Sequence, residues 1–445
     1  MKALLAATGA AVAVALTWGL AVGAQDAPPS ADRSAFDVPD AWYASLPPDP
    51  EEATEAFLQR VPAAVRVKGD AYGATRHLTD VLRVVVLVSA IALMLFSGAA
   101  ARMRRLAERA TSVTPLRDAL FAAQLFLALF LLSLPVDTYG VYVRVRQAGF
   151  SDRPYWEWLG ETALAWSVDT VFYVVGATAL MALVRRRPAS WPAWGVAVYA
   201  SLSAAYVFLT PIYIEPLFNR FTPLADGPPR DAILSMARAN GVPVDTVFVR
   251  DASRQSVLLN ASVSGLVGTA RIVLDDNTVA QAPLGETRMV MGHEIGHYVL
   301  GHGARGILLV ALVMGIGFVA MGWSARRLIR RYGRSWGIPA FGDIASLAVL
   351  WGLFSVWSFL ALPATNGITR QHEREADLYG LNTAREPLAV GEFMIRNADA
   401  YQLDPSWLEE WIFFSHPTAR SRIYVAMRWR AAQLASSLGR PTPEP

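Results

Sequence analysis

The chain has 445 residues, of which 53% are hydrophobic and only 17% are charged, and its formal net charge is +3. This composition disfavours a wholly soluble protein, and the lack of a long basic face with interleaved aromatic residues disfavours a nucleic-acid partner. Because the sequence contains no cysteine, disulfides, thiolate ligands and cysteine nucleophiles are excluded, and any metal must be held by His, Asp or Glu.

The N-terminal segment, residues 1–24, carries Lys2 ahead of an almost unbroken apolar run that ends in small residues. This layout is typical of a secretory signal peptide, and an uncleaved first membrane helix fits the same residues equally well. Residues 25–80 begin with a polar stretch rich in proline and are predicted to form a polar linker.

Six later apolar runs are long enough, or nearly so, to cross about 30 Å of hydrocarbon as helices. They are predicted near Val81–Ala101, Ala119–Val136, Leu164–Val184, Trp194–Ile214, Ile307–Ala325 and Ile344–Leu362. The first four make residues 81–214 an N-terminal transmembrane region. With residues 1–24 as a possible further span, the sequence predicts a polytopic helical bundle of six or seven spans.

Clusters of arginine follow the first, third and fifth of these runs, so all three lie on one side of the membrane if every run crosses once. The clusters are Arg102, Arg104, Arg105 and Arg109; Arg185, Arg186 and Arg187; and Arg326, Arg327, Arg330, Arg331 and Arg334. Positive loops stay in the cytoplasm, so residues 215–305 and 363–445 are expected on the non-cytoplasmic side. Together with the export-like leader, this predicts a multi-pass protein of a bacterial inner membrane.

Residues 215–435 are predicted to form a zinc peptidase domain of α+β type that includes two membrane spans, about 307–325 and 344–362. The expected elements are a short amphipathic helix at Asp231–Asn240, strands at Thr246–Arg250, Ser256–Val263 and Arg271–Asp275, a turn at Gly265 and Gly268, and a helix from about Glu286 to Leu300. The tail, residues 436–445, is predicted to be disordered.

The last of these helices contains the run His293-Glu294-Ile295-Gly296-His297. Residues four apart on a helix share a face, so both imidazoles can reach one metal ion. Glu294 projects about 100° away from His293 around the helix, where it can reach a water molecule at the metal without being a ligand. The alternative is a pair of ordinary surface or core histidines.

A catalytic zinc ion needs a third protein ligand and one open position. The next polar cluster offers Glu373 and Asp377 four residues apart, so a helix presents both on one face. This pair suits a ligand carboxylate, Glu373, and an acceptor, Asp377, that orients a ligand imidazole through its other ring nitrogen. On spacing alone, His372 and Glu375 are rival ligands.

Two further histidines lie near these motifs. His302 follows Gly301 at the helix end, where a capping or surface role is the usual one. His416, in Ser415-His416-Pro417, is ambiguous, because a histidine beside a zinc site can donate to a developing oxyanion but is otherwise structural.

Five motifs occur in a characteristic order. They are Tyr213 to Leu224 (YIEPLFNRFTPL), the run from Asn260-Ala261 to Arg271-Ile272-Val273-Leu274, the HEIGH motif, Glu373 with Ala376-Asp377, and Ser415-His416-Pro417 to Arg422-Ile423. In these motifs the chain resembles the type I CAAX prenyl endopeptidases, which are integral-membrane gluzincin zinc peptidases. The resemblance covers nearly the whole chain after the leader, and the export-like leader indicates a bacterial member.

The resemblance implies one Zn²⁺ ion per chain, bound by His293, His297 and Glu373, with Asp377 hydrogen-bonded behind them. Eukaryotic relatives carry this site on the cytosolic side, whereas the arginine loops of this chain favour the opposite side. A prenylated substrate is therefore not implied by the fold and the chemistry alone.

The resemblance also implies a substrate-binding region. Asn260 and Ala261 are expected on an edge strand that binds the substrate backbone, and His416 and Arg422 are expected to contact the scissile region. From the residues alone, Arg422 is equally well an ordinary ion-pair residue, because structural ion pairs are common.

We therefore expect a mostly α, membrane-embedded zinc metalloendopeptidase in which Glu294 is the general base and His416 stabilises the oxyanion. The expected partners are the lipid bilayer and a peptide or protein substrate. That substrate is either a C-terminal or lipidated segment, or a damaged membrane or exported protein cleaved in quality control. A catalytically silent membrane chaperone or receptor on the same scaffold is the alternative, and the intact HEIGH motif argues against it.

Overall fold

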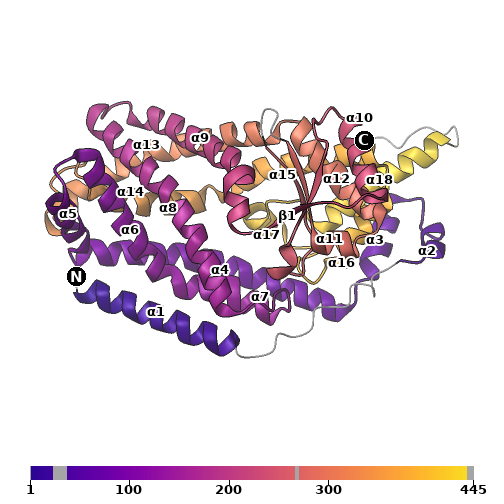
Figure 1. Cartoon of the computed structure of the whole chain (residues 1–445), viewed down its shortest axis with the longest axis horizontal. Helices are drawn as coiled ribbons and strands as arrows, with labels where there is room; N and C mark the ends of the chain where they lie inside the picture. Colours follow the sequence, from indigo (N-terminus) through magenta and orange to yellow (C-terminus); the bar gives the residue numbers. More distant parts are fainter. Residues whose placement is uncertain (1, 24–37, 266–269, 438–445) are drawn as a thin grey trace.

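The computed structural model describes residues 2–23, 38–265 and 270–437 and has the predicted class, a mostly helical bundle with a small sheet (Figure 1). Residues 266–269 of the predicted glycine turn and residues 438–445 of the predicted tail lie outside the described residues. Residues 436 and 437, which were predicted to be disordered, end the last helix, α18 (Ala419–Ser437).

Within the described ranges, five helices are long and apolar enough to cross a membrane. They are α4 (Ala63–Phe96), α6 (Thr114–Asp137) with its continuations η2 (Thr138–Val143) and α7 (Arg144–Gln147), α8 (Tyr155–Arg186), α9 (Trp191–Leu209) with its continuation η3 (Thr210–Ile214), and α13 (His302–Trp336). A sixth span results if α14 (Ser346–Leu360) and α15 (Leu362–Ala384), which meet at a 51° bend, count as one. The polytopic bundle predicted from the apolar runs is confirmed.

The span predicted near Val81–Ala101 ends earlier than expected. Helix α4 stops at Phe96, because Gly98 adopts a left-handed conformation with φ 68° and a new helix, α5 (Ala99–Ala110), begins beyond it. Glycine reaches this backbone conformation without the steric penalty of a Cβ atom.

Glycines allow α13 to approach its neighbours closely. A Cβ atom added at Gly317 would lie 2.3 Å from the indole Nε1 of Trp357, and one at Gly322 would lie 2.8 Å from the ring of Trp191. Small residues at helix interfaces are the usual means of tight packing inside a bilayer, where no hydrophobic force draws helices together.

The N-terminal helix α1 (Lys2–Gly23) lies along the bundle and packs on α6 (Figure 1). Its Ala15 and Val22 are buried in a cluster with Tyr142 and Trp158, and Trp18 stacks on Tyr139. This packing agrees with the membrane-helix alternative for residues 1–24, which remains a prediction.

Residues 25–80 are largely helical where the structure describes them, although the sequence predicted a linker. They include α2 (Asp40–Ala44), α3 (Pro50–Gln59) and the first half of α4. The α3 helix is capped by Asp49 and buries Phe57 and Leu58 in the core formed with α16 (Pro387–Arg396) and α18. Glu51, Glu52 and Gln59 are exposed on its outer face, so α3 is an amphipathic helix whose polar composition resembles that of a linker.

Among the described residues the sheet has four strands in the order β1-β2-β4-β3, with β2 and β4 parallel and the outer pairs antiparallel. The strands are β1 (Phe221–Pro223), β2 (Val247–Arg250), β3 (Ala261–Ser264) and β4 (Arg271–Asp275). The strand predicted at Arg271–Asp275 matches β4 in full, whereas the strand predicted at Ser256–Val263 corresponds to β3 and begins only at Ala261. The short β1 was not predicted.

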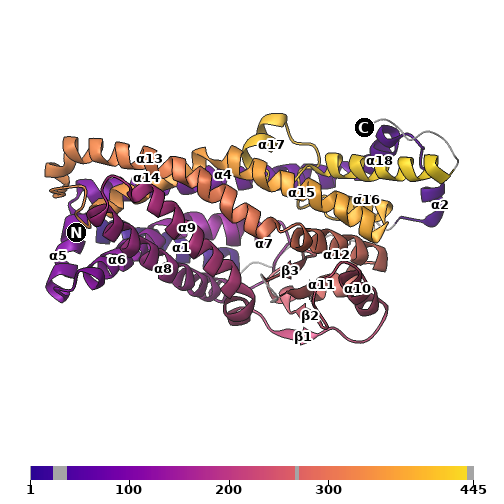
Figure 2. The ribbon, with the colours of Figure 1, turned by 90° about the horizontal axis from the view of Figure 1, so that it is seen from above.

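The remaining elements surround the sheet and the ends of the membrane helices. They are η4 (Glu215–Leu217), α10 (Pro228–Ala239), η5 (Ala252–Arg254), α11 (Asp276–Gln281), α12 (Leu284–Val299) and α17 (Trp407–Phe413). Figure 2 shows α12 between the sheet on one side and α15, α16 and α18 on the other. A buried ion pair between Glu286 of α12 and Arg396 of α16, 3.0 Å long, holds this arrangement.

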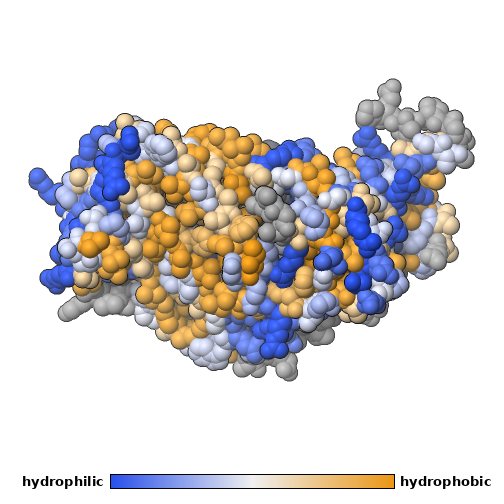
Figure 3. Space-filling model, turned by 45° about the horizontal axis from the view of Figure 1, so that its top comes forward, coloured by the Kyte–Doolittle hydropathy of each residue, from blue (hydrophilic) through white to orange (hydrophobic). Residues whose placement is uncertain are grey.

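The two ends of the molecule along its long axis differ. Helix α5, which carries the first arginine cluster, lies at one end, and the sheet lies toward the other (Figure 1). At the α5 end Arg104 pairs with Asp343 at 2.6 Å, and Arg185 pairs with the buried Asp118. Figure 3 shows hydrophobic residues over the middle of one face and hydrophilic residues toward both ends, as expected of a membrane-spanning bundle.

Candidate active site

Helices α12 and α15 bring the predicted site residues together because glycines line their contact. A Cβ atom at Gly380 would lie 2.9 Å from the backbone nitrogen of His293, and one at Gly292 would lie 3.2 Å from the carbonyl oxygen of Gly380. A larger residue at either position would push the helices apart. The close approach places Glu373 of α15 opposite the two histidines of α12.

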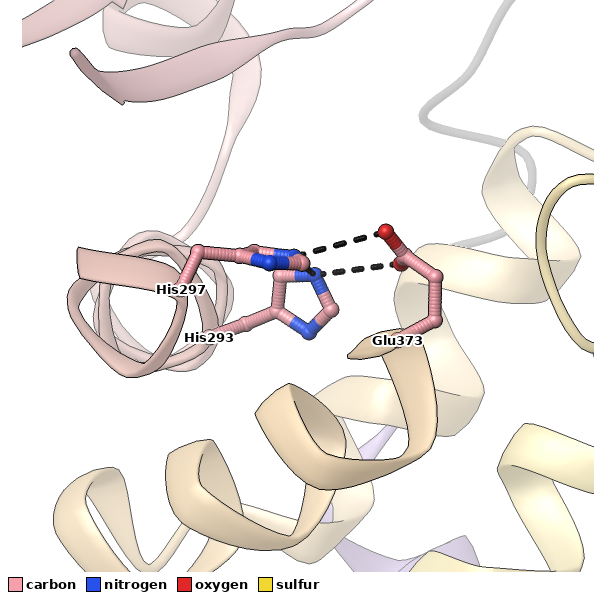
Figure 4. Close-up of side chains that lie close together, drawn as sticks. All are labelled: His293, His297 and Glu373. Carbon is pink, nitrogen blue, oxygen red and sulfur yellow. Dashed lines mark hydrogen bonds and ion pairs between the residues drawn. The ribbon is translucent and has the colours of Figure 1, made fainter. Parts of the chain in front are cut away.

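His293, His297 and Glu373 converge on one point (Figure 4). Each offers one ligand atom, and the three atoms lie within 4.8 Å of one another. His293 Nε2 and His297 Nε2 are 3.0 Å apart, and each lies 3.3 Å from a carboxylate oxygen of Glu373. Among the described residues this is the group of His and Glu side chains that could hold a metal ion.

The hydrogen bonds behind His293 leave its ring nitrogen Nε2 with a free lone pair. Its Nδ1 lies 2.9 Å from the carboxylate of Asp377, which can only accept, so Nδ1–H donates and Nε2 faces Glu373. A carboxylate and two nitrogen lone pairs directed at one point fit a divalent cation.

Glu294 lies in the same cleft but outside the ligand group. Burial raises the pKa of its carboxyl above the ordinary value, and the backbone N–H of Val263 on strand β3 donates a hydrogen bond to it. The carboxylate therefore connects the HEIGH helix to the edge strand of the sheet. This position suits a proton acceptor that acts on a molecule bound between the helix and the strand.

A cavity of about 240 Å³ opens beside the metal ligands. Its lining includes Asn260, Ala261, Glu294, His416 and Arg422, so the structure gathers the predicted substrate-binding residues around one cleft. The sequence did not identify Tyr72, Arg76 and His77 of α4, which line the same cleft. No short-range pattern connects α4 to a motif some 220 residues later.

Strand β3 presents its outer edge to this cleft. Asn260 accepts a hydrogen bond from Asp275 N–H at 3.0 Å, so its backbone faces β4 and not the edge. In an antiparallel ladder the next residue faces the opposite way, which directs the backbone of Ala261 outward. Ala261 is thus placed to pair with an extended chain, whereas Asn260 can offer a substrate only its exposed side chain.

His416 and Arg422 lie in different positions relative to the donor group. His416 Nε2 is 3.5 Å from Glu373 Oε2, and its side chain is 58% exposed to the cleft. Arg422 instead clasps Asp377 with two hydrogen bonds of 2.5 and 3.0 Å and lies 3.5 Å from His293 Nδ1. The ion-pair alternative for Arg422 therefore describes its main contact.

The two rival ligands lie outside the donor group. His372 is buried and stacks on His302 with 4.4 Å between ring centroids, and Glu375 contacts His302 and Arg305. His302 is 4% exposed, which contradicts the surface role expected for it. Gly301, with φ 66°, breaks the helix before His302, and this glycine was the sequence signal for a turn that returns the side chain to His297.

Comparison with known proteins identifies the family of this chain. The model for peptidase family M48 matches residues 226–430, and the model for the CAAX prenyl protease N-terminal region, with five membrane helices, matches residues 50–220. An uncharacterized metalloprotease of Bacillus subtilis, YhfN, is 30% identical over 338 residues, which cover 75% of this chain and 78% of the relative. The chain belongs to peptidase family M48.

More distant relatives are consistent with this membership. CAAX prenyl protease 1 of Saccharomyces cerevisiae is 28% identical over 318 residues, which cover 66% of this chain and 68% of the relative. The crystal structure of S. mikatae Ste24p shares the fold, with a TM-score of 0.65 over 95% of this chain and 97% of that chain at 20% identity. This M48 member is a multi-pass membrane metalloprotease that resembles CAAX prenyl proteases, and its family implies a bound metal and peptide substrates.

Proposed function

We propose that this M48 protein is a zinc-dependent endopeptidase that cleaves extended peptide segments at the non-cytoplasmic surface of a bacterial inner membrane. The observation that carries the proposal is the convergence of His293, His297 and Glu373 beside a cleft that also contains Glu294. A catalytically silent scaffold has no need for an uncoordinated carboxylate next to such a donor group.

We assign one Zn²⁺ ion to His293, His297 and Glu373. Two imidazoles and one carboxylate are a common ligand set of catalytic zinc, which leaves one position for water or substrate. When bound, zinc would activate a water molecule and polarise the scissile carbonyl. Asp377, hydrogen-bonded to His293 Nδ1, keeps this imidazole in the tautomer that presents Nε2.

Glu294 is assigned the proton transfers. Its carboxylate takes a proton from the attacking water and returns it to the amine of the departing peptide. Burial raises its pKa, which brings the carboxyl closer to the pH at which both steps are efficient.

His416 is assigned to the oxyanion. Its Nε2 lies on the cleft side of Glu373, 3.5 Å from Oε2, and Ser415 Oγ lies 3.0 Å from its Nδ1. An Nε2–H group at this position can donate to the carbonyl oxygen as negative charge develops on it.

The edge strand β3 is assigned to the substrate. The outward backbone of Ala261 can add an extended segment to the sheet by main-chain hydrogen bonds, as peptide-binding edge strands do. Such pairing needs an unfolded or terminal segment, and it depends little on the side chains of that segment because the hydrogen bonds are made by the main chain. It therefore supports both a C-terminal or lipidated segment and an unfolded membrane or exported protein as substrates.

The proposed chemistry is tested with Glu294→Gln in the purified full-length chain. Cleavage of a quenched fluorescent peptide is expected to fall by about 10²–10⁴-fold, because the proton acceptor is lost, while zinc content stays at one ion per chain. Glu157→Gln, at an exposed position outside the cleft, is the control and keeps full activity. Undiminished turnover by Glu294→Gln would refute the assigned base.

The proposed side of the membrane is tested with single cysteines, since the natural chain contains none. Ser235→Cys lies on exposed α10 in the catalytic half, and Ala110→Cys lies at the exposed end of α5. In intact cells a membrane-impermeant maleimide is expected to label Ser235→Cys only. The reverse labelling pattern would place the site in the cytoplasm.

A further inference from the structure

A chain of polar contacts runs from the candidate zinc site, on the side of His297, through the buried His302 to Glu375 and Arg305 near the surface. His297 Nδ1 lies 2.9 Å from His302 Nδ1, and His302 Nε2 lies 3.1 Å from Oε2 of Glu375. Arg305 Nη1 donates to the same carboxylate at 2.8 Å, and Gln371 Nε2 donates to it at 3.0 Å. The contacts link α12, the first turn of α13 and α15.

The chemistry of Glu375 determines where each proton lies. Its carboxylate only accepts, so His302 must carry its proton on Nε2 and donate it to Glu375. A neutral His302 then has a lone pair on Nδ1, which accepts the Nδ1–H of His297. The Nε2 of His297 is left with its lone pair directed at Glu373, 3.3 Å away.

We infer that His302 and Glu375 form a positioning relay that holds His297 in its metal-binding tautomer and orientation. The inference deepens the proposed function and rests on it, because it concerns the same zinc ion. A ligand imidazole is usually oriented by a carboxylate or a carbonyl on its other nitrogen. Here a second imidazole stands between the ligand and the carboxylate.

The relay is the counterpart of the support on the other side of the site. His293 donates directly to Asp377, whose charge is balanced by Arg422, and His297 donates through His302 to Glu375, whose charge is balanced by Arg305. Each ligand imidazole thus has its own acceptor and its own arginine. Both zinc-facing nitrogens are kept free of protons by this arrangement.

His302 is also well placed to hold a fixed orientation. It is 4% exposed, and its ring lies parallel to that of His372, with 6° between the ring planes and 4.4 Å between the centroids. The left-handed Gly301 before it allows the chain to turn between α12 and α13. A purely packing role would need the ring but not its Nδ1 acceptor, and this difference can be tested.

The test compares His302→Phe with His302→Asn in the full-length chain purified in detergent. Phenylalanine keeps the stack but removes the acceptor, whereas the amide oxygen of asparagine takes the place of Nδ1. Zinc affinity is measured by competition with a chromophoric chelator, and thermal unfolding is followed on the same samples. His372→Phe is the matched control, because it keeps the stacked pair and leaves the contacts of His297 intact.

We expect His302→Phe to lower zinc affinity by roughly 10- to 100-fold, as loss of such supporting groups generally does. We expect His302→Asn and His372→Phe to stay within about threefold of the unaltered chain, well below that range. Equal affinities of His302→Phe and the unaltered chain would overturn the relay, and so would an Asn variant as weak as the Phe variant. An unaltered chain that binds no zinc would instead overturn the proposed function, and the relay with it.

Glu375→Ala provides a second measurement that does not depend on the folding of His302→Phe. Glu375 is partly exposed and contacts the exposed Arg305, so its loss leaves no buried charge unpaired. We expect zinc affinity to fall in the same direction by about tenfold, the lower end for such groups. An unchanged affinity would contradict the role assigned to this carboxylate.

Discussion

The two sides of the cleft are built in different ways. On the metal side, His293 and Glu373 are buried, and each imidazole of the donor group has an acceptor behind it. On the opposite side, α4 and the loop before α18 present exposed groups, including Arg76 and His416. The difference indicates that packing fixes the geometry of the metal ligands, whereas the substrate side keeps groups free to contact a variable peptide.

The largest effect on zinc affinity is expected from a substitution on the metal side of the cleft. Glu373→Ala removes one of three ligands, so zinc affinity should fall by more than the roughly 100-fold typical of supporting groups. Zinc bound after dialysis against a weak chelator measures the loss. Glu410→Ala, on the neighbouring helix α17, is the control and should retain its metal. Full zinc occupancy of Glu373→Ala would mean that another group is the third ligand.

A substitution on the substrate side of the cleft should change the reaction rate without changing zinc binding. His416→Ala should lower kcat by about 10²–10³-fold, because a donor to the developing oxyanion is lost, while zinc content and thermal stability stay unchanged. Steady-state kinetics and metal analysis on one preparation measure both quantities. Loss of zinc in this variant would instead place His416 among the ligands.

A smaller effect on zinc affinity is expected when Asp377, which is hydrogen-bonded to His293, is altered. Asp377→Asn keeps the shape of the side chain but removes its charge, which weakens its hold on both His293 and Arg422. Zinc affinity should fall by roughly tenfold. If affinity is unaltered in a competition titration, the contact with Asp377 does not tune the site.

The smallest effect concerns the edge strand. Ala261→Pro removes an outward-facing N–H, so KM for a peptide substrate should rise by about 5- to 10-fold, the equivalent of one hydrogen bond, with zinc retained. Ser262→Pro is the contrasting variant, since its N–H faces β4, and it should lower the melting temperature. An unchanged KM for Ala261→Pro would argue against substrate pairing at this edge.

The features that could be predicted from the sequence are those that depend on local spacing along the chain. The spacing of His293 and His297 and the pairing of Glu373 with Asp377 depend on one helical turn each, so local periodicity was sufficient. The apolar runs likewise revealed the bundle, because bilayer thickness sets their length. The amphipathic helix α3 was missed, since its polar and proline residues resemble a linker when the core that it covers is unknown.

Other features depended on contacts between distant segments. The role of His302 required the turn at Gly301 and the position of Glu375, 73 residues later. Arg76 and His77 reach the cleft only because α4 extends beyond the membrane-spanning part of the bundle, a length that the apolar run from Val81 did not reveal. Such contacts carry no period in the sequence, and tertiary packing alone brings them together.

The central claim is that two imidazoles of α12 and one carboxylate of α15 bind a single zinc ion. A crystal structure of the zinc-loaded chain, with anomalous diffraction measured at the zinc edge, tests it most directly. We predict one anomalous peak about 2.0–2.2 Å from His293 Nε2, His297 Nε2 and a carboxylate oxygen of Glu373. A zinc peak away from these three side chains, or none at all in an active preparation, would contradict the account.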